Sequence, residues 1–499
     1  MTDQASFCNP VLPGFYPDPS VCRVGEDYFL VTSSFAYFPG VPIFRSNNLV
    51  DWDQLGHVLD RPSQLDLMDT RGSLSEGIFA PTVRFHDGRF WMITTNATDS
   101  GGTAFFVTAT DPAGPWSDPV PVDIDGIDPD IAWDEHGACW VHFSTASSID
   151  RVCIDDETGK VLEGPVTTWS GTGLQYPEAP HLFQRDGIWY LMIAEGGTES
   201  GHGVSIARGP SPVGPWESCP ANPIISHRST DRPIQNTGHA DLVEAPDGSW
   251  WMVLLGTRPA GSSPGFHVLG RETFLVPVDW VDGWPVVREL LPEMTRRPPG
   301  PLEIASESDR DDFDSASIDA SWIGVRRSPR LFASLAERPG WLTVRGEADT
   351  LDDFYPTMVG RRQQHHRFVA RAAVDLPPAG EAGLTVYLDE KHHAEIGVRD
   401  DVIVVSVRIG PARTTLAQVP RPAGPVTLRI EAKPGGQEPD RLEFGFQDGA
   451  GNVTNLAEID GRYFSTQVAT GFTGRMLGMY AVSCLAAFDW FEYQPDKSR

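Results

Sequence analysis

A pattern repeated five times along residues 25–254 limits the folds open to this chain more than any other feature. Each copy has an acidic or polar turn and then a β-prone run with an aromatic residue at its start or centre. The marker aromatics of the five copies are Tyr28, Trp91, Trp140, Tyr190 and Trp251, at steps of 63, 49, 50 and 61 residues. Such steps are typical of propeller blades rather than of helical repeats. We therefore predict a five-bladed β-propeller over residues 1–290.

The repeat ends at a proline-rich stretch, residues 284–301, and we place a linker at 291–308. Beyond it, runs at 341–345, 384–388, 402–408, 426–430 and 488–493 alternate at the spacing of a β-sandwich. Helical periodicity is weak, and 49 Gly and 43 Pro punctuate short strands. The predicted fold is all-β: a five-bladed propeller followed by a concanavalin-like β-sandwich over residues 309–499.

Charge excludes several kinds of partner. The chain has 39 Lys and Arg against 68 Asp and Glu, a net charge of -29, which would repel phosphate backbones and anionic lipid. No stretch approaches the ~20 apolar residues of a membrane span, and the start lacks the basic and apolar regions of a signal peptide. We expect a cytoplasmic protein with no nucleic-acid or membrane partner, and assembly into a homo-oligomer is left open.

A short motif stands before each marker aromatic. The motifs are Tyr16-Pro-Asp18-Pro-Ser, Phe79-Ala-Pro-Thr82, Ile127-Asp128-Pro-Asp130, Tyr176-Pro-Glu178-Ala-Pro-His181 and Gly238-His239-Ala-Asp241. Asp18 lies 10 residues before its marker, and Asp128, Glu178 and His239 lie 12 before theirs. An isolated Asp beside proline indicates only a turn. Equivalent positions in a propeller converge on the axis, so these side chains are expected to share one site.

Three carboxyl groups in one site favour glycoside hydrolysis. That reaction needs a carboxylic acid on the leaving oxygen and a carboxylate on the opposite face, and a further negative charge can keep the acid protonated. The alternative is a carbohydrate-binding propeller and sandwich without catalysis. A pure binding protein needs aromatic platforms and polar contacts but not three acids at equivalent positions, so we favour the enzyme.

The motifs also carry a family resemblance. The segments Asn9-Pro-Val-Leu-Pro-Gly-Phe-Tyr-Pro-Asp-Pro-Ser20, Phe38-Pro-Gly-Val-Pro-Ile43, Gly126-Ile-Asp-Pro-Asp130, Pro177-Glu-Ala-Pro-His181 and Leu269-Gly-Arg-Glu-Thr-Phe274 resemble glycoside hydrolase family 43. The chain is most similar to its β-xylosidase and α-L-arabinofuranosidase branch, and Gly360-Arg-Arg-Gln-Gln364 is similar to that branch's C-terminal domain. The resemblance implies exo-acting, inverting release of terminal β-D-xylose or α-L-arabinofuranose, or both, from oligosaccharides, with no required cofactor.

The resemblance also implies catalytic roles. Asp18 matches the general base, Glu178 the general acid, and Asp128 the carboxylate that orients the acid and raises its pKa. Two departures affect local geometry: Ala179 stands where the family usually has Gly, and Asp130 where a small residue is common. For an inverting enzyme the carboxyl groups of Asp18 and Glu178 should stand roughly 6.5 to 9.5 Å apart.

Arg271 matches a residue that hydrogen-bonds sugar hydroxyls, although an ion pair with Glu272 is the alternative. We expect Phe35, Phe38 and Phe79 to form apolar walls for a pentose ring, with core packing as their alternative role.

His239 is matched to a histidine that faces the axial channel, where a water-mediated structural Ca²⁺ ion is an open option; a buried core histidine is the alternative. The Gly-flanked loop 469–475 is expected to carry Phe472 toward the propeller as an aromatic lid, unless that ring packs inside the sandwich.

Overall fold

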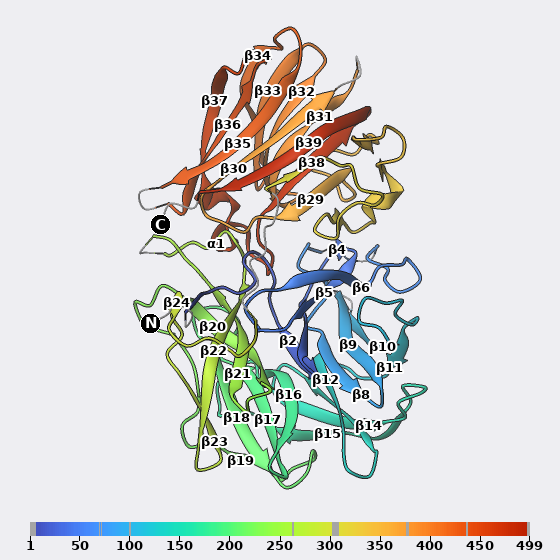
Figure 1. Ribbon diagram of the computed structural model, residues 1–499, viewed down its shortest axis with the longest axis vertical. Helices are drawn as coiled ribbons and strands as arrows, with labels where there is room; N and C mark the ends of the chain where they lie inside the picture. The colour runs from blue at the N-terminus through green and yellow to red at the C-terminus, as the bar shows by residue number, and fades with distance from the viewer. Residues whose placement is uncertain are drawn as a thin grey trace.

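The computed structural model describes residues 6–68, 70, 72–98, 101–261, 264–301, 309–375, 379–435 and 438–496. Two β domains are stacked along the long axis of the molecule, the propeller below and the sandwich above (Figure 1). Within the described ranges, helix is limited to α1 (Thr466–Ala469) and the 3₁₀ turns η1 (Pro329–Leu331) and η2 (Gly461–Phe464). None of the helices in these ranges is long and apolar enough to cross a membrane. The predicted all-β fold is confirmed.

Five antiparallel sheets form the propeller. Sheet one contains β2 (Ser20–Val24), β3 (Asp27–Val31), β5 (Gly40–Ser46) and β6 (Asp53–Leu59). Sheet two contains β7 (Gly77–Ile78), β8 (Thr82–His86), β9 (Arg89–Thr98), β10 (Gly101–Ala109) and β11 (Val120–Val122). Sheet three contains β12 (Ile127–Trp133), β13 (Cys139–Ser144), β14 (Ile149–Ile154) and β15 (Val161–Trp169). Sheet four contains β16 (Glu178–Arg185), β17 (Ile188–Glu195), β18 (Gly203–Gly209) and β19 (Glu217–Ser218), and sheet five β20 (Gln235–Glu244), β21 (Trp250–Thr257), β22 (Glu272–Val281) and β23 (Trp284–Val287).

The marker aromatics occupy equivalent places in these sheets. Each lies on the second main strand of its sheet: β3, β9, β13, β17 and β21. The preceding strands, β2, β8, β12, β16 and β20, lie next to one another around the axis (Figure 1). Apolar side chains of neighbouring sheets share cores, and one cluster joins Tyr28, Tyr190 and Trp251 from sheets one, four and five. The repeat in the sequence therefore corresponds to the blades, and the ring closes between the first and the fifth.

The N-terminal segment supports this closure. Strand β1 (Phe7–Cys8) pairs with β24 (Glu293–Met294), and the Asn9 side chain exchanges hydrogen bonds with the backbone of Leu275. Because β24 belongs to this pairing, the propeller extends past its expected end at residue 290. Residues 302–308, the second part of the expected linker, lie outside the described residues.

The C-terminal domain is a sandwich of two antiparallel sheets around one apolar core. One sheet contains β25 (Arg310–Asp311), β27 (Ala333–Ser334), β28 (Leu342–Arg345), β30 (Phe368–Asp375), β35 (Val426–Pro434), β36 (Asp440–Gln447), β37 (Val453–Asp460) and β39 (Leu485–Pro495). The other contains β29 (Met358–Arg362), β31 (Glu381–Asp389), β32 (His392–Arg399), β33 (Val402–Ile409), β34 (Ala412–Pro420) and β38 (Met476–Val482). Burial alternates along β30 and β35, as expected for strands with one face on the core.

The two domains share structure at their junction. Strand β4 (Tyr37–Phe38) of the propeller segment pairs with β26 (Gly324–Val325) of the second domain. A single apolar cluster contains Phe15 and Tyr37 together with Met358, Tyr387 and Tyr480. Such a shared core holds the domains in a fixed relation, in contrast to a detachable module on a flexible linker.

Candidate active site

The motifs before the marker strands meet in one small pocket of about 70 Å³. The residues that line it are Asp18, Phe35, Phe79, Ala80, Ile127, Asp128, Glu178, Thr198, His239, Arg271 and Phe472. They come from all five blades and from the second domain. Of the site residues that the sequence indicated, Phe38 alone is absent from this lining.

Local backbone irregularities aim these side chains at the axis. Asp18, Asp128 and His239 have positive φ angles of 57°, 53° and 42°, and Ala179, next to Glu178, has 51°. The register of the innermost strands shifts at the same places, between residues 127 and 130, 178 and 181, and 238 and 240. Strained residues and bulges of this kind cluster at functional sites, where they redirect a side chain that regular alternation would place elsewhere.

Asp18 is held as an anion. It is 4% exposed, and its carboxylate accepts hydrogen bonds from Ser33 Oγ at 2.6 Å and Arg271 Nη1 at 2.9 Å. His239 Nδ1 lies 3.3 Å from Oδ1. Burial opposes ionisation of Asp18, but Arg271, His239 and the Ser33 hydrogen bond outweigh burial and lower its pKa below the usual range. An ionised, oriented carboxylate is what a general base requires.

Glu178 and Asp128 have the opposite electrostatics. Burial, and then repulsion from Asp18, raises the pKa of Glu178 to about 7. Burial, and then repulsion from Glu178 and Asp18, raises the pKa of Asp128 well above its usual range. Near neutral pH, Glu178 and Asp128 therefore retain a proton, whereas Asp18 is ionised. The sequence analysis assigned the raised pKa of Glu178 to Asp128, whereas burial and Asp18 are its main causes here.

His202, which the sequence analysis missed, faces Glu178. Its Nε2 lies 3.7 Å from Glu178 Oε1, and its Nδ1 lies 3.1 Å from the Asn236 carbonyl oxygen. Burial lowers the pKa of His202 to about 4, so the ring is neutral. Because a carbonyl oxygen can only accept, the ring proton is assigned to Nδ1, and the Nε2 lone pair is directed at Glu178.

Arg271 binds the candidate base and not its sequence neighbour. Its Nη1 donates hydrogen bonds to Asp18 Oδ1 and to Thr198 Oγ1, both at 2.9 Å. Glu272, the alternative partner, instead accepts two hydrogen bonds from Arg258, at 2.7 and 2.8 Å. Thr198 was also missed; the sequence signal was the glycine pair 196–197 directly after a marker strand.

Three phenylalanines form an apolar wall. The Phe472 ring lies 5.9 Å from that of Phe35 and 6.2 Å from that of Phe79, measured between centroids. The backbone N–H of Phe472 donates to Ser75 Oγ in the propeller at 2.8 Å. The alternative, in which Phe472 packs inside the sandwich, is therefore wrong. Phe38 was expected in the pocket wall, and this prediction is wrong. It is 3% exposed and packs in the core shared by the first two blades.

The axis beneath the pocket is closed by an arginine. Arg84 on β8 pairs with Asp130 at 2.8 Å and Asp241 at 2.9 Å, and its Nη2 lies 3.1 Å from His181 Nδ1. Ser20 on β2 donates to Asp241 at 2.9 Å. These five side chains come from the innermost strands of all five blades, so one guanidinium links the whole ring.

The axial ion pairs decide whether the residues of this channel can bind the expected calcium ion. The axial carboxylates Asp130 and Asp241 are engaged by Arg84, and His239 is directed at Asp18. Within the described ranges, no group of three or more His, Cys, Asp or Glu side chains is arranged to hold a metal ion. The donor set does not fit Ca²⁺, which prefers six to eight oxygen ligands.

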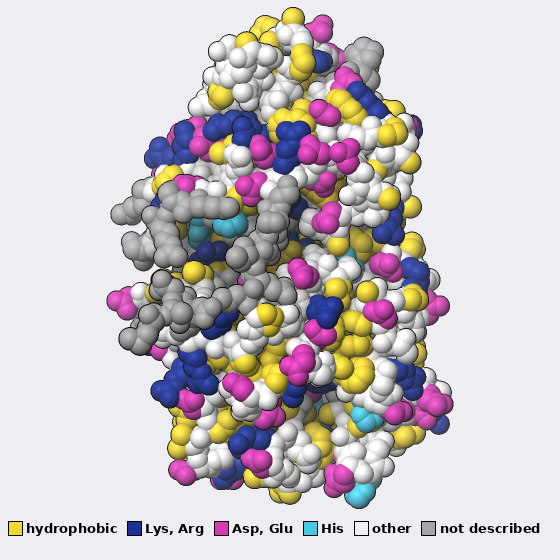
Figure 2. Space-filling view, viewed as in Figure 1, with side chains coloured by type: hydrophobic (Ala, Val, Ile, Leu, Met, Phe, Trp, Pro, Cys, Tyr) yellow, Lys and Arg dark blue, Asp and Glu magenta, His cyan; other side chains and the backbone are white. Residues whose placement is uncertain are grey.

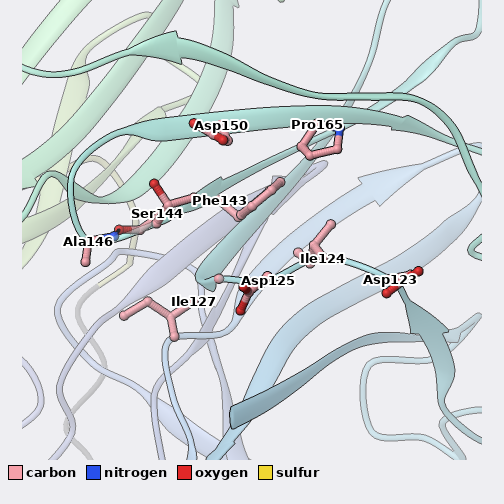
Figure 3. A pocket seen from close by; sticks show the side chains of 11 residues that line it. Asp123, Ile124, Asp125, Ile127, Phe143, Ser144, Ala146, Asp150 and Pro165 are labelled. Atoms are coloured by element: carbon pink, nitrogen blue, oxygen red, sulfur yellow. Dashed lines mark hydrogen bonds between the residues drawn. The ribbon is translucent and has the colours of Figure 1, made fainter.

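A second, larger pocket of about 640 Å³ adjoins the site (Figure 3). Ile127 lines both pockets, and the remaining lining residues, among them Asp125, Phe143 and Ala146, belong to the third blade and the segments beside it.

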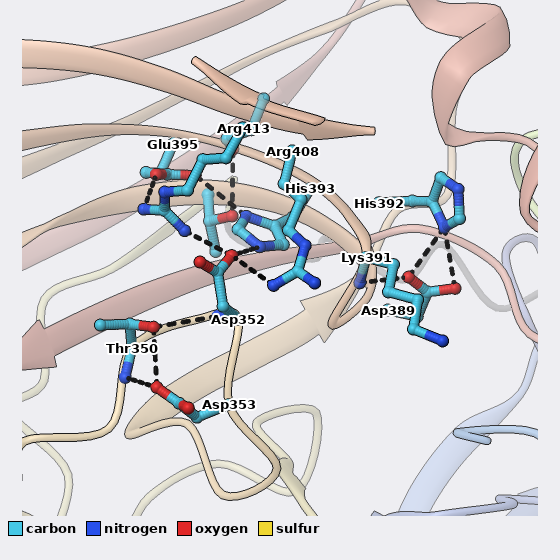
Figure 4. Close-up of polar contacts among 12 residues, drawn as sticks. Thr350, Asp352, Asp353, Asp389, Lys391, His392, His393, Glu395, Arg408 and Arg413 are labelled. Atoms are coloured by element: carbon cyan, nitrogen blue, oxygen red, sulfur yellow. Dashed lines mark hydrogen bonds and ion pairs between the residues drawn. The ribbon is translucent and has the colours of Figure 1, made fainter. Parts of the chain in front are cut away.

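Two histidines of the second domain, His392 and His393, serve its own structure. His393 is fully buried, its Nδ1 lies 3.0 Å from Glu395 Oε2, and its Nε2 lies 2.9 Å from Asp352 Oδ1 (Figure 4). Arg413 pairs with both carboxylates, and neighbouring His392 pairs with Asp389. This cluster ties the loop that carries Asp352 to the sheet.

Both halves of the chain match known families. The profile of Glycosyl hydrolases family 43 matches residues 7–285, and that of the Beta xylosidase C-terminal Concanavalin A-like domain matches residues 310–494. The chain is 39% identical to a non-reducing end alpha-L-arabinofuranosidase of Bacteroides ovatus, over 98% of this chain and 95% of that one. It is 37% identical to a xylosidase/arabinosidase of Butyrivibrio fibrisolvens, over 95% of each.

Solved structures agree over the whole length. A GH43 protein from Bacillus licheniformis superimposes with a TM-score of 0.93 at 32% identity, covering 98% of this chain and 100% of that one. A xylan beta-1,4-xylosidase from Bacillus halodurans gives a TM-score of 0.90 at 30% identity with the same coverage.

Proposed function

The chain belongs to glycosyl hydrolase family 43 and is an exo-acting glycoside hydrolase, and from this premise we propose that it releases terminal pentose units with inversion of configuration. The proposed products are β-D-xylose from xylo-oligosaccharides and α-L-arabinofuranose cleaved from arabinose-containing oligosaccharides. We therefore reject the alternative of a carbohydrate-binding propeller and sandwich without catalysis.

The mechanism rests on one observation: the same pocket holds an ionised carboxylate, Asp18, and a protonated carboxylic acid, Glu178. Asp18 has a lowered pKa, whereas the pKa of Glu178 is raised to about 7. Carboxyl groups whose environments separate their pKa values in this way serve as base and acid. Asp18 takes a proton from the attacking water as the water adds to the anomeric carbon, and Glu178 donates its proton to the departing glycosidic oxygen.

Asp128 and Arg271 are proposed to support this step. Asp128 is proposed to orient Glu178, and a backbone hydrogen bond from Ala179 fixes the Asp128 carboxyl group. Arg271 keeps Asp18 ionised and offers its remaining donors to sugar hydroxyls.

The pocket walls support exo action on pentoses. Three aromatic rings restrict the pocket to a small volume at the end of the propeller axis; they belong to Phe35, Phe79 and Phe472. A pocket of this size suits one terminal sugar ring rather than an internal sugar unit of a chain. The oligosaccharide is the expected partner. Asp and Glu side chains are interspersed with Lys and Arg over the face in Figure 2.

The test is a side-by-side assay of nitrophenyl β-D-xylopyranoside and nitrophenyl α-L-arabinofuranoside, with NMR of the first-formed anomer. We expect release of nitrophenol from at least one pentoside with inversion, and its loss in the Asp18→Asn variant. Retention of configuration, or full activity of Asp18→Asn, would overturn the assignment.

A further inference from the structure

A large pocket lies between the domains, separate from the catalytic one. Its volume is about 840 Å³, and it shares no lining residue with the catalytic pocket. The propeller contributes Tyr16, Phe44 and Trp52, and the second domain contributes most of the segment 310–322, without Ala316 and Ala320, and Arg362. Sites for small molecules in proteins commonly have this size and lie at domain interfaces.

Arg362 in this pocket is a buried cation without a carboxylate partner in the described ranges, and the approach of the Tyr16 hydroxyl only weakly counters its burial. It is 2% exposed, and none of its three nitrogen atoms has a hydrogen-bond partner among the described residues. Its guanidinium packs against the rings of Phe15 at 4.9 Å and Tyr16 at 4.4 Å, which leaves its in-plane donors unused. Nearby His57 is neutral and adds no second positive charge, because burial and then the charge of Arg362 lower its pKa to about 3.

Two other buried arginines show how this chain ordinarily satisfies such a group. Arg475 donates to both carboxylate oxygens of Asp440 and to backbone carbonyls. Arg326 donates to Thr70 and pairs with Glu390. Since buried guanidinium groups need acceptors, the unused donors of Arg362 indicate that an acceptor enters the pocket from outside.

The other lining residues indicate what kind of acceptor. Five carboxylates line the pocket against three arginines, and this negative balance disfavours an anionic ligand; they are Asp51, Asp311, Asp312, Asp314 and Asp319, and Arg310, Arg361 and Arg362. The carboxylates can accept hydrogen bonds from hydroxyl groups, while the aromatic rings provide faces for a sugar. A neutral saccharide supplies hydroxyl oxygens to Arg362 and hydroxyl donors to the carboxylates at the same time.

We propose that the interdomain pocket is a second saccharide-binding site, which holds a neutral xylo-oligosaccharide through hydrogen bonds from Arg362. The choice of sugar rests on the proposed function. The segment that carries Tyr16 also carries Asp18 two residues later, so both sites are built on the same stretch of chain.

The experiment is a calorimetric titration of the full-length Glu178→Gln variant, which keeps the shape of the catalytic pocket, with xylotriose. Two binding events per chain are expected. Adding Arg362→Lys should weaken one of them about tenfold and leave the other unchanged, because the shorter ammonium lacks the planar fork.

A second pair of variants avoids any change to the buried arginine. Ser317 is exposed and lines the pocket, so Ser317→Trp should block the second site, whereas Ala316→Trp, next to it but outside the lining, should not. Neither should change the hydrolysis of a nitrophenyl pentoside by the otherwise unmodified chain.

A single binding event that none of these substitutions alters would overturn the proposal, as would binding of glucuronic acid or citrate in preference to xylotriose. These outcomes differ from failure of the proposed function, which would appear as no pentose released by the unmodified chain.

Discussion

The ring of Phe472, from the second domain, lies 5.9 Å from the ring of Phe35 in the first blade, with 31° between their planes. The same ring lies 5.3 Å from the guanidinium carbon of Arg271, which pairs with Asp18. The second domain thus forms part of the wall of the catalytic pocket, although Phe472 lies 198 residues after Phe274, the end of the last propeller motif.

Removing this ring should affect substrate binding more than folding. Phe472→Ala is expected to lower kcat/KM on xylobiose about tenfold, because the terminal sugar loses an apolar wall worth roughly 1–2 kcal/mol. Stability should change little, since Phe472 is 37% exposed. Phe85→Ala, which removes a ring that is 40% exposed on β8, is the matched control. Equal activity of the two variants would show that Phe472 is no part of the substrate pocket.

Glu178→Gln should separate substrates by their leaving groups. Loss of the acid is expected to lower turnover of xylobiose by about 10² to 10⁴, and that of a nitrophenyl pentoside much less, because nitrophenolate departs without protonation. Glu217→Gln, an exposed partner of Arg208, should leave both rates unchanged. Equal losses on both substrates would contradict the role of Glu178 as acid.

The same substitution should raise stability above pH 7. The pKa of Glu178 is about 7 in the folded chain and 4.5 in the unfolded one, so ionisation favours the unfolded chain as pH rises from 4.5 to 7. Glutamine removes this penalty. Thermal unfolding should therefore show Glu178→Gln more stable than the parent at pH 8 and equal to it at pH 4; equal stability at pH 8 would show that the pKa is not raised.

The pH profile of kcat/KM should be bell-shaped. Its basic limb should fall near pH 7, where Glu178 loses its proton, and its acidic limb should lie below pH 4, where Asp18 gains one. In Asp128→Asn the basic limb should stay near pH 7, because Asp128 still holds its proton when Glu178 ionises, and burial and Asp18 set the pKa of Glu178. A basic limb that moves to lower pH would show that Asp128 is charged when Glu178 ionises.

Arg84 should be essential for stability. Arg84→Met leaves Asp130 and Asp241 buried without a counter-charge and is expected to cost about 3–5 kcal/mol in urea unfolding at pH 7. The pKa of Asp241 is lowered to about 2, so its stabilising contribution is present above pH 3.8 and is lost as pH falls toward 2. The difference from the parent should shrink over that range. Arg89→Met, an exposed change in the same hairpin, is the control; similar losses in both variants would contradict the axial role.

The propeller and its three carboxyl groups could be predicted because their signals are local. A blade places its turn, its aromatic strand and its axial residue within about twelve residues, so spacing alone aligned Asp128, Glu178 and His239. Phe35 and Phe79 were placed in the pocket on similar grounds, but the same argument failed for Phe38. Its ring packs into the core of the first two blades, and only the packing of neighbouring sheets decides that.

The sequence by itself therefore determined the repeat, the two all-β domains and the chemistry available at the axis, because these depend on residue types at short, fixed spacings. Tertiary structure decided which groups meet. Arg271 reaches Asp18 rather than Glu272, Arg84 closes the axis, and Phe472 completes the pocket from the other domain. Each of these contacts joins residues far apart in the chain, and the separate pKa values of Asp18 and Glu178 arise only when burial and these neighbours act together.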